Sequence, residues 1–379
     1  MKFIFICLFA ILLSTPLIIT TFNIPIETTN NENRTLEKSP SISWNNYNSA
    51  ETVVKKWNAF FNALFNYKND FDKYYKDNFI FKSLLFDSYK KIKLNLFQTN
   101  PIPPKVLKGK DGWYFLGNSF SEVTLESLGL DTLNKNELEQ IKRNYEGNQQ
   151  WFKDQGIDYY IAIAPNKHSI YHDFLGVRIS PNRKKEINQL ASLMKPRELI
   201  NLGKGFKEKD EQLFLKTNTH WNDLGAYYGY ENLMHFLQLN YPVLSILSLD
   251  EVRDSSVLSN SEDLTEMLGI PANEIKTELF IKDRNAKRQE GKIDIPENVN
   301  PLTYEIRYKS EANPLKILFF RDSFSTDMID YIAEGFGESV FIWNHMMSKE
   351  LILKEKPDIV IHEFIERDIQ ILSYETLKP

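Results

Sequence analysis

Cysteine is almost absent from this chain of 379 residues. The single residue, Cys7, lies inside an apolar run at the start of the sequence, so no disulfide can form within the chain and the rest of it has no thiolate to use. A chain of this length buries most of the surface that its unfolded state exposes. It therefore needs neither a disulfide nor a structural metal in order to fold.

Glycine and proline are also scarce, with 15 and 16 residues, while hydrophobic residues make up 42% and charged residues 26%. These proportions exclude collagen-like, disordered and disulfide-scaffold proteins. Lys and Arg number 46 against 51 Asp and Glu, so the net charge of −5 provides no basic surplus for binding a nucleic acid. The aromatic content of 13% suits either a large core or a cleft that binds sugars.

Residues 1–22 predict a signal peptide or a signal anchor. Lys2 precedes an apolar run over residues 3–13, and a second apolar run follows Pro16. A short basic start before an apolar stretch is typical of secretory signals. Because no small-x-small cleavage site follows, we favour an uncleaved anchor that holds the protein at a membrane outside the cytoplasm, although Pro16 disfavours one straight helix. The polar residues 23–40 then indicate a linker.

Residues 41–100 predict a small N-terminal helical region. Apolar and aromatic side chains recur at helical spacing over residues 49–67, and residues 70–97 predict two further helices. Asn100-Pro101 and Pro103-Pro104 interrupt this pattern and mark a boundary.

Residues 101–379 predict an α/β domain with a parallel sheet flanked by helices. Strands are expected at 157–164, 198–202, 213–215, 315–320, 339–343 and 359–364, and helices at 134–155, 223–239, 324–334 and 349–356. Alternation of strands and helices is typical of parallel sheets. Two short apolar runs around residues 109–112 predict a hairpin. Residues 241–310 show little periodicity and predict a loop-rich insertion.

Ser323 is the strongest candidate for chemistry, because a site in a parallel sheet lies beyond the carboxyl ends of its strands. It stands between a predicted buried strand and a helix start, where its hydroxyl would project from a tight turn and free amides would stabilise an oxyanion. The alternative is that Ser323 only caps the helix that follows.

His220 is the leading candidate for the base that a serine nucleophile requires. Asn218 lies two residues earlier, on the same side of an extended segment, where it would orient the imidazole. His168 and His345 also follow predicted strands and are rival bases. The remaining histidines of the folded region are interpreted as packing residues, His235 in a helix and His362 in a strand; His172 has no assigned role. No pair of histidines or carboxylates has a spacing typical of a metal site, and we expect neither a metal nor a cofactor.

Taken together, these residues resemble the SGNH-hydrolase-like domains of the alginate O-acetyltransferase AlgJ/AlgX-like family. The similar segments keep their order through most of the chain. They are residues 32–36, 75–79, 110–117, 164–171, 218–222, 262–268, 321–325 and the pair Glu366-Arg367.

The resemblance implies an extracytoplasmic enzyme that moves acetyl groups onto an exopolysaccharide, with Ser323 as nucleophile and His220 as base. It also implies that a membrane-bound O-acyltransferase passes the acetyl group to this domain. The candidates for binding the substrate or the oxyanion are Asn166, Lys167, Trp221, Arg321, Asp322 and Arg367.

Two residues depart from the family pattern. Asn218 stands where the family has the acid of Asp-x-His-Trp, and an amide does not stabilise an imidazolium as a carboxylate does; in a Ser-His-Asp enzyme that change costs about 10⁴ in turnover. Arg321 replaces a common glycine and either crowds the turn or holds an anionic substrate. Asp322 or Glu366 would be an alternative acid.

Three hypotheses therefore stay open. The first is an active acetyltransferase, and the second is an acetyl esterase that uses the same acyl-serine chemistry with water as the final acceptor. The third, which Asn218 favours, is a non-catalytic protein for binding polysaccharide or for assembly of an export complex.

Overall fold

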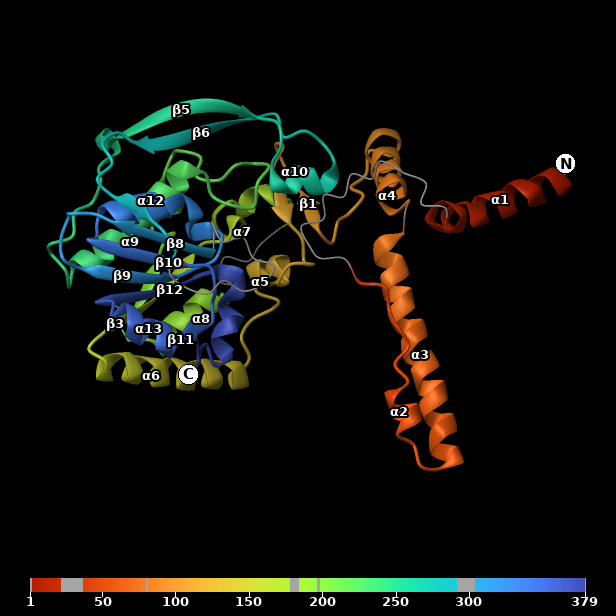
Figure 1. Ribbon diagram of the computed structural model, residues 1–379. Helices are drawn as coiled ribbons and strands as arrows, with labels where there is room; N and C mark the ends of the chain where they lie inside the picture. The colour runs from red at the N-terminus through yellow and green to blue at the C-terminus, as the bar shows by residue number, and fades with distance from the viewer. Residues whose placement is uncertain are drawn as a thin grey trace. The chain divides into compact units, whose positions relative to one another are not determined.

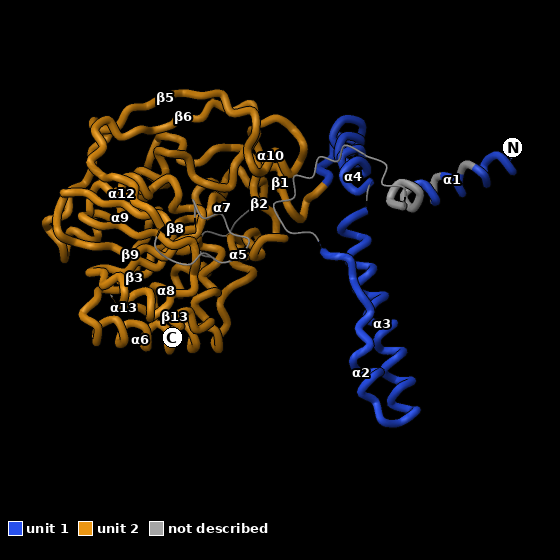
Figure 2. Tube along the Cα trace, in the orientation of Figure 1, with its two compact units in different colours: residues 1–101 blue, residues 102–379 orange. Residues whose placement is uncertain are grey.

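The computed structural model describes residues 2–21, 37–79, 81–177, 184–195, 198–291 and 304–378 (Figure 1). The chain divides into two compact units, Met1–Pro101 and Ile102–Pro379 (Figure 2). Most of the expected linker, and the family-like segment 32–36 within it, lie outside the described residues.

Unit 1 is helical. Its elements are α1 (Lys2–Thr21), α2 (Asn45–Asn48), α3 (Val53–Asn78), α4 (Lys82–Lys91) and one π-helical turn, η1 (Ile92–Leu96). Thr52 caps α3, since its hydroxyl accepts a hydrogen bond of 3.3 Å from the amide of Lys55. The helix runs past the expected end at residue 67, because no glycine or proline stops it before Asn78.

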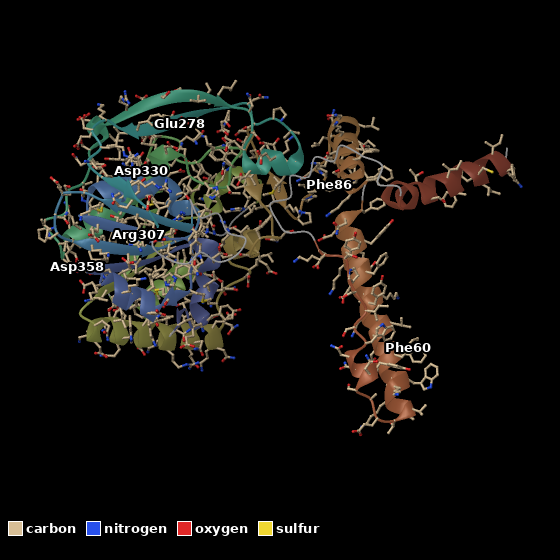
Figure 3. All side chains as sticks on the ribbon, viewed as in Figure 1. Phe60, Phe86, Glu278, Arg307, Asp330 and Asp358 are labelled. Atoms are coloured by element: carbon tan, nitrogen blue, oxygen red, sulfur yellow. The ribbon has the colours of Figure 1, made fainter. Side chains whose placement is uncertain are left out.

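Aromatic side chains line α3 at helical spacing. Trp57 stacks on Phe61 with ring centroids 5.9 Å apart, and Phe60, labelled in Figure 3, contacts both rings. No helix in the described part of the chain is long and apolar enough to span a membrane.

Unit 2 is built on one central sheet. Within the described residues its seven strands lie in the order β4 (Leu199–Asn201), β3 (Asp158–Ala164), β12 (Ile359–Ile365), β9 (Lys316–Phe320), β10 (Glu338–Ile342), β8 (Glu305–Lys309) and β7 (Lys287–Gln289). The first five are parallel, while β8 and β7 add an antiparallel edge. The expected α/β fold is confirmed, and the wholly parallel sheet is corrected to a mixed one.

Helices cover both faces of this sheet (Figure 1). Tyr159, Ile161 and Ile163 of β3 pack on one face with α6 (Lys135–Asp154), α8 (Glu186–Leu193), α13 (Lys349–Glu355) and η6 (Glu366–Ser373). The alternate residues Tyr160, Ala162 and Ala164 belong to the core of the other face, which includes α9 (Asp223–Gln238), η5 (Phe324–Met328) and α12 (Ile329–Glu334). Both sets of side chains are buried, which is why these strands are continuous apolar runs in the sequence.

The helix expected at 134–155 is α6, and its start illustrates why the sequence was informative. The side chain of Asn134 accepts hydrogen bonds from the amides of Asn136 and Glu137, while the carboxylate of Glu137 accepts from the amide of Asn134. This reciprocal capping fixes the first turn. Gly156, with φ of +71°, follows the last turn in the left-handed conformation that glycine adopts freely.

The hairpin expected around residues 109–112 is also present, as β1 (Val106–Lys108) paired with β2 (Tyr114–Leu116). Shorter elements complete unit 2. They are α5 (Val123–Leu128), α7 (Lys167–Ile170), η2 (His172–Phe174), η3 (Phe206–Glu208), η4 (Leu249–Glu251), β11 (Met347–Ser348) and β13 (Leu377–Lys378).

Two expectations were wrong. Residues 213–215 form no strand of the sheet; Phe214 makes only an isolated bridge to Trp221. The described part of residues 241–310 is not mainly loop, because β5 (Val252–Ser259) and β6 (Glu274–Ile281) pair as a long antiparallel ribbon that carries α10 (Asp263–Leu268) between its strands. Most side chains of β5 are exposed, so the ribbon lacks the apolar alternation that marks a half-buried strand.

A buried ion network joins the antiparallel strand β8 to the parallel part of the sheet. Arg307, labelled in Figure 3, donates two hydrogen bonds of 3.0 and 2.6 Å to Glu355 and another to Glu305. Lys316 of β9 also donates to Glu355, at 2.7 Å. Burial raises the pKa of the Glu355 carboxyl, but the hydrogen bonds from Arg307 and Lys316 outweigh it and lower the pKa to about 2.

We expect Arg307→Met to lower the free energy of unfolding at pH 7 by about 3 kcal/mol, because it leaves two buried carboxylates short of a partner. The folded pKa of Glu355 lies below its unfolded value, so the wild type holds this stability above about pH 4.5 and loses it as the pH falls toward 2. Urea unfolding across that range measures both effects. Glu146→Gln, which breaks the exposed pair with Lys142, is the control and should change little. Equal stability of Arg307→Met and wild type would contradict the prediction.

Candidate active site

Ser323 lies in the turn that leaves the carboxyl end of β9. The turn is fixed by Asp322, whose two carboxylate oxygens accept hydrogen bonds from the amides of Phe324, at 2.7 Å, and Ile365, at 2.9 Å. Ile365 ends β12, so the turn is tied to the neighbouring strand. The hydroxyl of Ser323 makes no capping hydrogen bond to η5. The alternative in which Ser323 is only a helix cap is therefore wrong.

His220 and Ser323 meet, as the sequence predicted. The Nε2 atom of His220 lies 2.8 Å from Oγ of Ser323. On the other side of the ring, Nδ1 lies 3.0 Å from Oδ1 of Asn218. Since an amide oxygen only accepts, this network assigns the imidazole proton to Nδ1 and leaves Nε2 to accept the serine proton.

The environment of His220 keeps the ring in its basic form. Burial is the largest cause of a pKa below the ordinary value, and the positive charge of Arg367 acts in the same direction. The carboxylates of Asp263, Asp322 and Glu262 oppose this shift. A neutral imidazole at neutral pH suits a general base.

Two acidic residues at the start of α10, Glu262 just before the helix and Asp263 at its first position, lie next to this pair, and sequence reasoning missed both. Glu262 accepts a hydrogen bond from Nδ2 of Asn218. Asp263 accepts from the hydroxyl of Thr219 and, at 2.8 Å, from the amide of Thr219. They lie in the segment that was expected to be loop-rich; the available signal was that residues 262–268 resemble the family.

Lys167 and Trp221, both candidates for binding substrate, are instead buried supports of the site. Lys167 donates hydrogen bonds to three carbonyl oxygens, those of Tyr114 at 2.7 Å, Lys216 at 2.8 Å and Asn218 at 2.9 Å. Burial lowers the pKa of its amine to about 7. The indole of Trp221 donates to the carbonyl of Phe324 at 2.9 Å and so joins the His220 segment to the Ser323 turn.

Asn166 and Arg367 come together at the ends of β3 and β12. The side chain of Asn166 is buried; it donates to Glu126 at 3.2 Å and accepts from the guanidinium of Arg367 at 3.4 Å. That guanidinium lies 5.6 Å from the ring centroid of Phe324, beside the serine turn. Arg367 is partly exposed, so it is the one cation among the predicted candidates that keeps access to solvent near the pair.

Arg321 and Asp322 were predicted to bind the substrate or the oxyanion, but their side chains make contacts that hold the serine turn in place. Arg321 has no exposed surface; its guanidinium stacks over Trp343 at 4.7 Å and donates to the carbonyl of Asp322 and the hydroxyl of Thr326. It therefore supports the turn from behind and does not present itself to an anionic substrate. Asp322 uses both of its oxygens on backbone amides and does not contact the imidazole as its acid.

The other histidines do not contact Ser323. His168 is buried, with Nε2 2.9 Å from the carbonyl of Leu116, and burial lowers its pKa to about 3. His345 stacks on Phe364 with ring centroids 4.5 Å apart. His362 is fully buried, as expected for a packing residue, whereas His235 is exposed on α9 and its packing role was wrong.

Glu366, the other alternative acid, is buried and accepts a hydrogen bond of 3.1 Å from the amide of Asn166. It therefore fastens the loop after β3. Within the described residues, no group of three or more His, Cys, Asp or Glu side chains is arranged to hold a metal ion.

The chain is similar to proteins of known family. Residues 106–294 match the family model described as the SGNH hydrolase-like domain of acetyltransferase AlgX. The probable alginate O-acetylase AlgJ of Pseudomonas fluorescens is 22% identical over 324 residues, which cover 79% of this chain and 77% of that protein. The chain belongs to the AlgJ/AlgX-like family.

The solved structures show the same fold at low identity. PatB1 of Bacillus cereus, in its structure with a sulfonyl adduct, aligns with a TM-score of 0.56 and 16% identity over 72% of this chain and 98% of that chain. PatB1 without that adduct gives a TM-score of 0.53 and 17% identity over 70% and 96%.

The group behind the imidazole of His220 is Asn218, the residue that departs from the acid implied by the family resemblance. Asn218 contacts Nδ1 of His220, and the carboxylate of Glu262 lies behind the amide. The amide orientation is thereby fixed, with the oxygen toward the imidazole and the nitrogen toward Glu262.

We expect Lys167→Met to lower the free energy of unfolding by about 3 kcal/mol, because three half-buried carbonyl groups lose their hydrogen bonds to the buried amine. Denaturant unfolding followed by tryptophan fluorescence measures this change. Lys110→Met is the matched control, since the exposed Lys110 donates to a single carbonyl, at 3.2 Å. The prediction fails if Lys167→Met unfolds at the same denaturant concentration as the control.

Proposed function

We propose that this protein is an O-acetyltransferase that carries the acetyl group on Ser323 and passes it to a hydroxyl group of an exopolysaccharide. The observation that carries the proposal is the 2.8 Å contact between Oγ of Ser323 and Nε2 of His220 at the carboxyl edge of the sheet. Membership of the AlgJ/AlgX-like family supports acetyl transfer as the chemistry.

The first half of the reaction acetylates the serine. Nε2 of His220 takes the hydroxyl proton while Oγ of Ser323 bonds to the acetyl carbonyl carbon of the donor. The tetrahedral intermediate then collapses, the bond between the carbonyl carbon and the leaving oxygen breaks, and the imidazolium returns the proton to that oxygen. The acetyl group is left on Ser323.

The second half uses the same groups in reverse. His220 takes a proton from a sugar hydroxyl, whose oxygen attacks the acetyl carbon on Ser323. Collapse of the second tetrahedral intermediate releases the sugar ester, and the imidazolium returns the proton to Oγ of Ser323. If water replaces the sugar, the product is acetate and the protein is an esterase.

The backbone amide of Ser323 is the donor that we assign to the oxyanion. Among the described residues, nothing accepts a hydrogen bond from it, whereas the amides on either side are used: that of Asp322 donates to Glu363 and that of Phe324 to Asp322. Arg367 adds a positive charge beside the turn. Fixed donors at the place where negative charge develops are a large source of rate acceleration.

The setting of the reaction is part of the proposal. The apolar start of the chain and the family relationship support a location outside the cytoplasm, where the acceptor is an exopolysaccharide. We propose a membrane-bound O-acyltransferase as the partner that delivers the acetyl group, because acetyl donors such as thioesters are made inside the cell.

We expect Ser323→Ala and His220→Ala each to lower the turnover of an activated acetyl ester by at least about 10³-fold. Ser192→Ala and His235→Ala, two exposed positions, are the matched controls and should keep wild-type turnover. The wild-type rate should rise with pH through a midpoint below that of an ordinary histidine, because the pKa of His220 is lowered. Wild-type turnover in Ser323→Ala would remove the serine from the mechanism.

Mass spectrometry of the quenched reaction should find one acetyl group on Ser323, and an added oligosaccharide should leave with that group. Release of acetate alone, at a rate that the oligosaccharide does not change, would favour the esterase. If wild type and variants all match a blank without enzyme, the non-catalytic alternative stands.

A further inference from the structure

We propose that Glu262 and Asp263, two carboxylates at the start of α10, together supply the negative charge that Asn218 lacks and position His220 for the proposed reaction. The inference rests on the proposed function of Ser323 and His220. It assigns the acid of the site to the insertion between β5 and β6, in place of the segment that carries the base.

The first branch runs through Thr219. Nδ1 of His220 lies 3.1 Å from the hydroxyl oxygen of Thr219, and that hydroxyl donates to Oδ2 of Asp263. The same carboxylate oxygen lies only 3.9 Å from Nδ1. Asp263 is fixed in place because its other oxygen accepts from the amides of Thr219, at 2.8 Å, and Leu264, at 2.7 Å.

The second branch runs through Asn218. Oδ1 of Asn218 accepts from Nδ1 of His220 and also, at 2.8 Å, from the amide of His220, while its Nδ2 donates to Glu262. The hydroxyl of Ser259 donates to the other oxygen of Glu262 at 2.6 Å. The donors from His220 to Asn218 and from Asn218 to Glu262 therefore both face away from the imidazole, and the branch ends on a carboxylate, which polarises the amide toward the ring.

Charges reach His220 from each element packed around it. α10 contributes Glu262 and Asp263, the turn after β9 contributes Asp322, and η6 contributes Arg367. Asp322 is already held by two backbone amides, and Arg367 opposes formation of an imidazolium. The two acids of α10 are therefore the negative charges whose hydrogen bonds lead to Nδ1.

The test compares Asp263→Asn and Glu262→Gln with the control variant Glu266→Gln. Glu266 is an exposed acid of α10, so its substitution removes the same charge. The first readout is the titration of the His220 ring by NMR in the full-length Ser323→Ala protein. Removing either acid should move the midpoint to lower pH, and removing both should move it further, because the lost negative charge had favoured the imidazolium. The control should titrate like the parent.

The second readout is the pH–rate profile of acetyl-ester hydrolysis with Ser323 present. The two single variants should each lose about 10- to 100-fold in kcat/KM, with the rising limb moved to lower pH as in the titration. A role limited to folding would lower the amount of active protein without moving that limb.

A charge exchange gives the complementary result. The double variant Asn218→Asp, Glu262→Gln returns a carboxylate to the position next to Nδ1, and it should recover the kcat/KM lost in Glu262→Gln alone. Asn218→Asp by itself places two carboxylates in hydrogen-bond contact, so it should recover less than the double variant.

The outcomes separate this inference from the proposed function. If the wild type hydrolyses no ester, the proposed function fails, yet the His220 titration still decides the role of α10. If His220 titrates identically in Asp263→Asn, Glu262→Gln and Glu266→Gln, the inference is overturned even when Ser323 proves to be the nucleophile. Should Asp263→Asn fail to fold, Thr219→Val breaks the same branch and takes its place, with Thr219→Ser expected to behave as wild type.

Discussion

The site depends on one carboxylate that never touches the reacting atoms, that of Asp322. By accepting from the amides of Phe324 and Ile365, it closes the turn after β9 and fastens it to the end of β12. Because the amide of Phe324 already donates to Asp322, the hydroxyl of Ser323 does not cap the helix and faces His220 instead. An ordinary N-cap serine would have its oxygen committed to the helix.

The segment that carries His220 is held against that turn by specific contacts of its own. The indole of Trp221 donates to the carbonyl of Phe324, which sets the residue next to His220 against the residue next to Ser323. Lys167 fixes the carbonyl of Asn218 from behind. Burying an ammonium costs free energy, which is why the pKa of Lys167 is lowered to about 7, and Asp263 and Glu274 partly offset that cost.

The sequence predicts those elements of the fold whose side chains are buried in a regular pattern. β3 and β12 are covered on both faces, so they are unbroken apolar runs, and Asn134 with Glu137 marks the start of α6. Ser323 follows from the rule that sites lie beyond strand ends, whereas His220 does not, because the residues before it form no strand of the sheet. β5 of the ribbon is largely exposed and has no such pattern. The antiparallel strand β8 carries Arg307, whose buried partner Glu355 lies 48 positions away in sequence, and no local pattern encodes that contact.

The residues that sequence reasoning missed, Glu262 and Asp263, have a common cause: their meaning lies in a contact across 44 positions of sequence with Asn218 and Thr219. In the sequence alone, Asn218 stands where an acid is expected and suggests an enzyme that has lost its activity. Read in the fold, the amide is one link between an imidazole and a carboxylate. Where the acid lies two residues from the base, a single segment sets the distance between the two side chains. In this protein the distance from the carboxylates to the imidazole depends on how α10 packs against the loop that carries His220. Whatever holds the ribbon against that loop therefore also sets the basicity of His220, so the insertion is part of the site's electrostatics as well as its architecture.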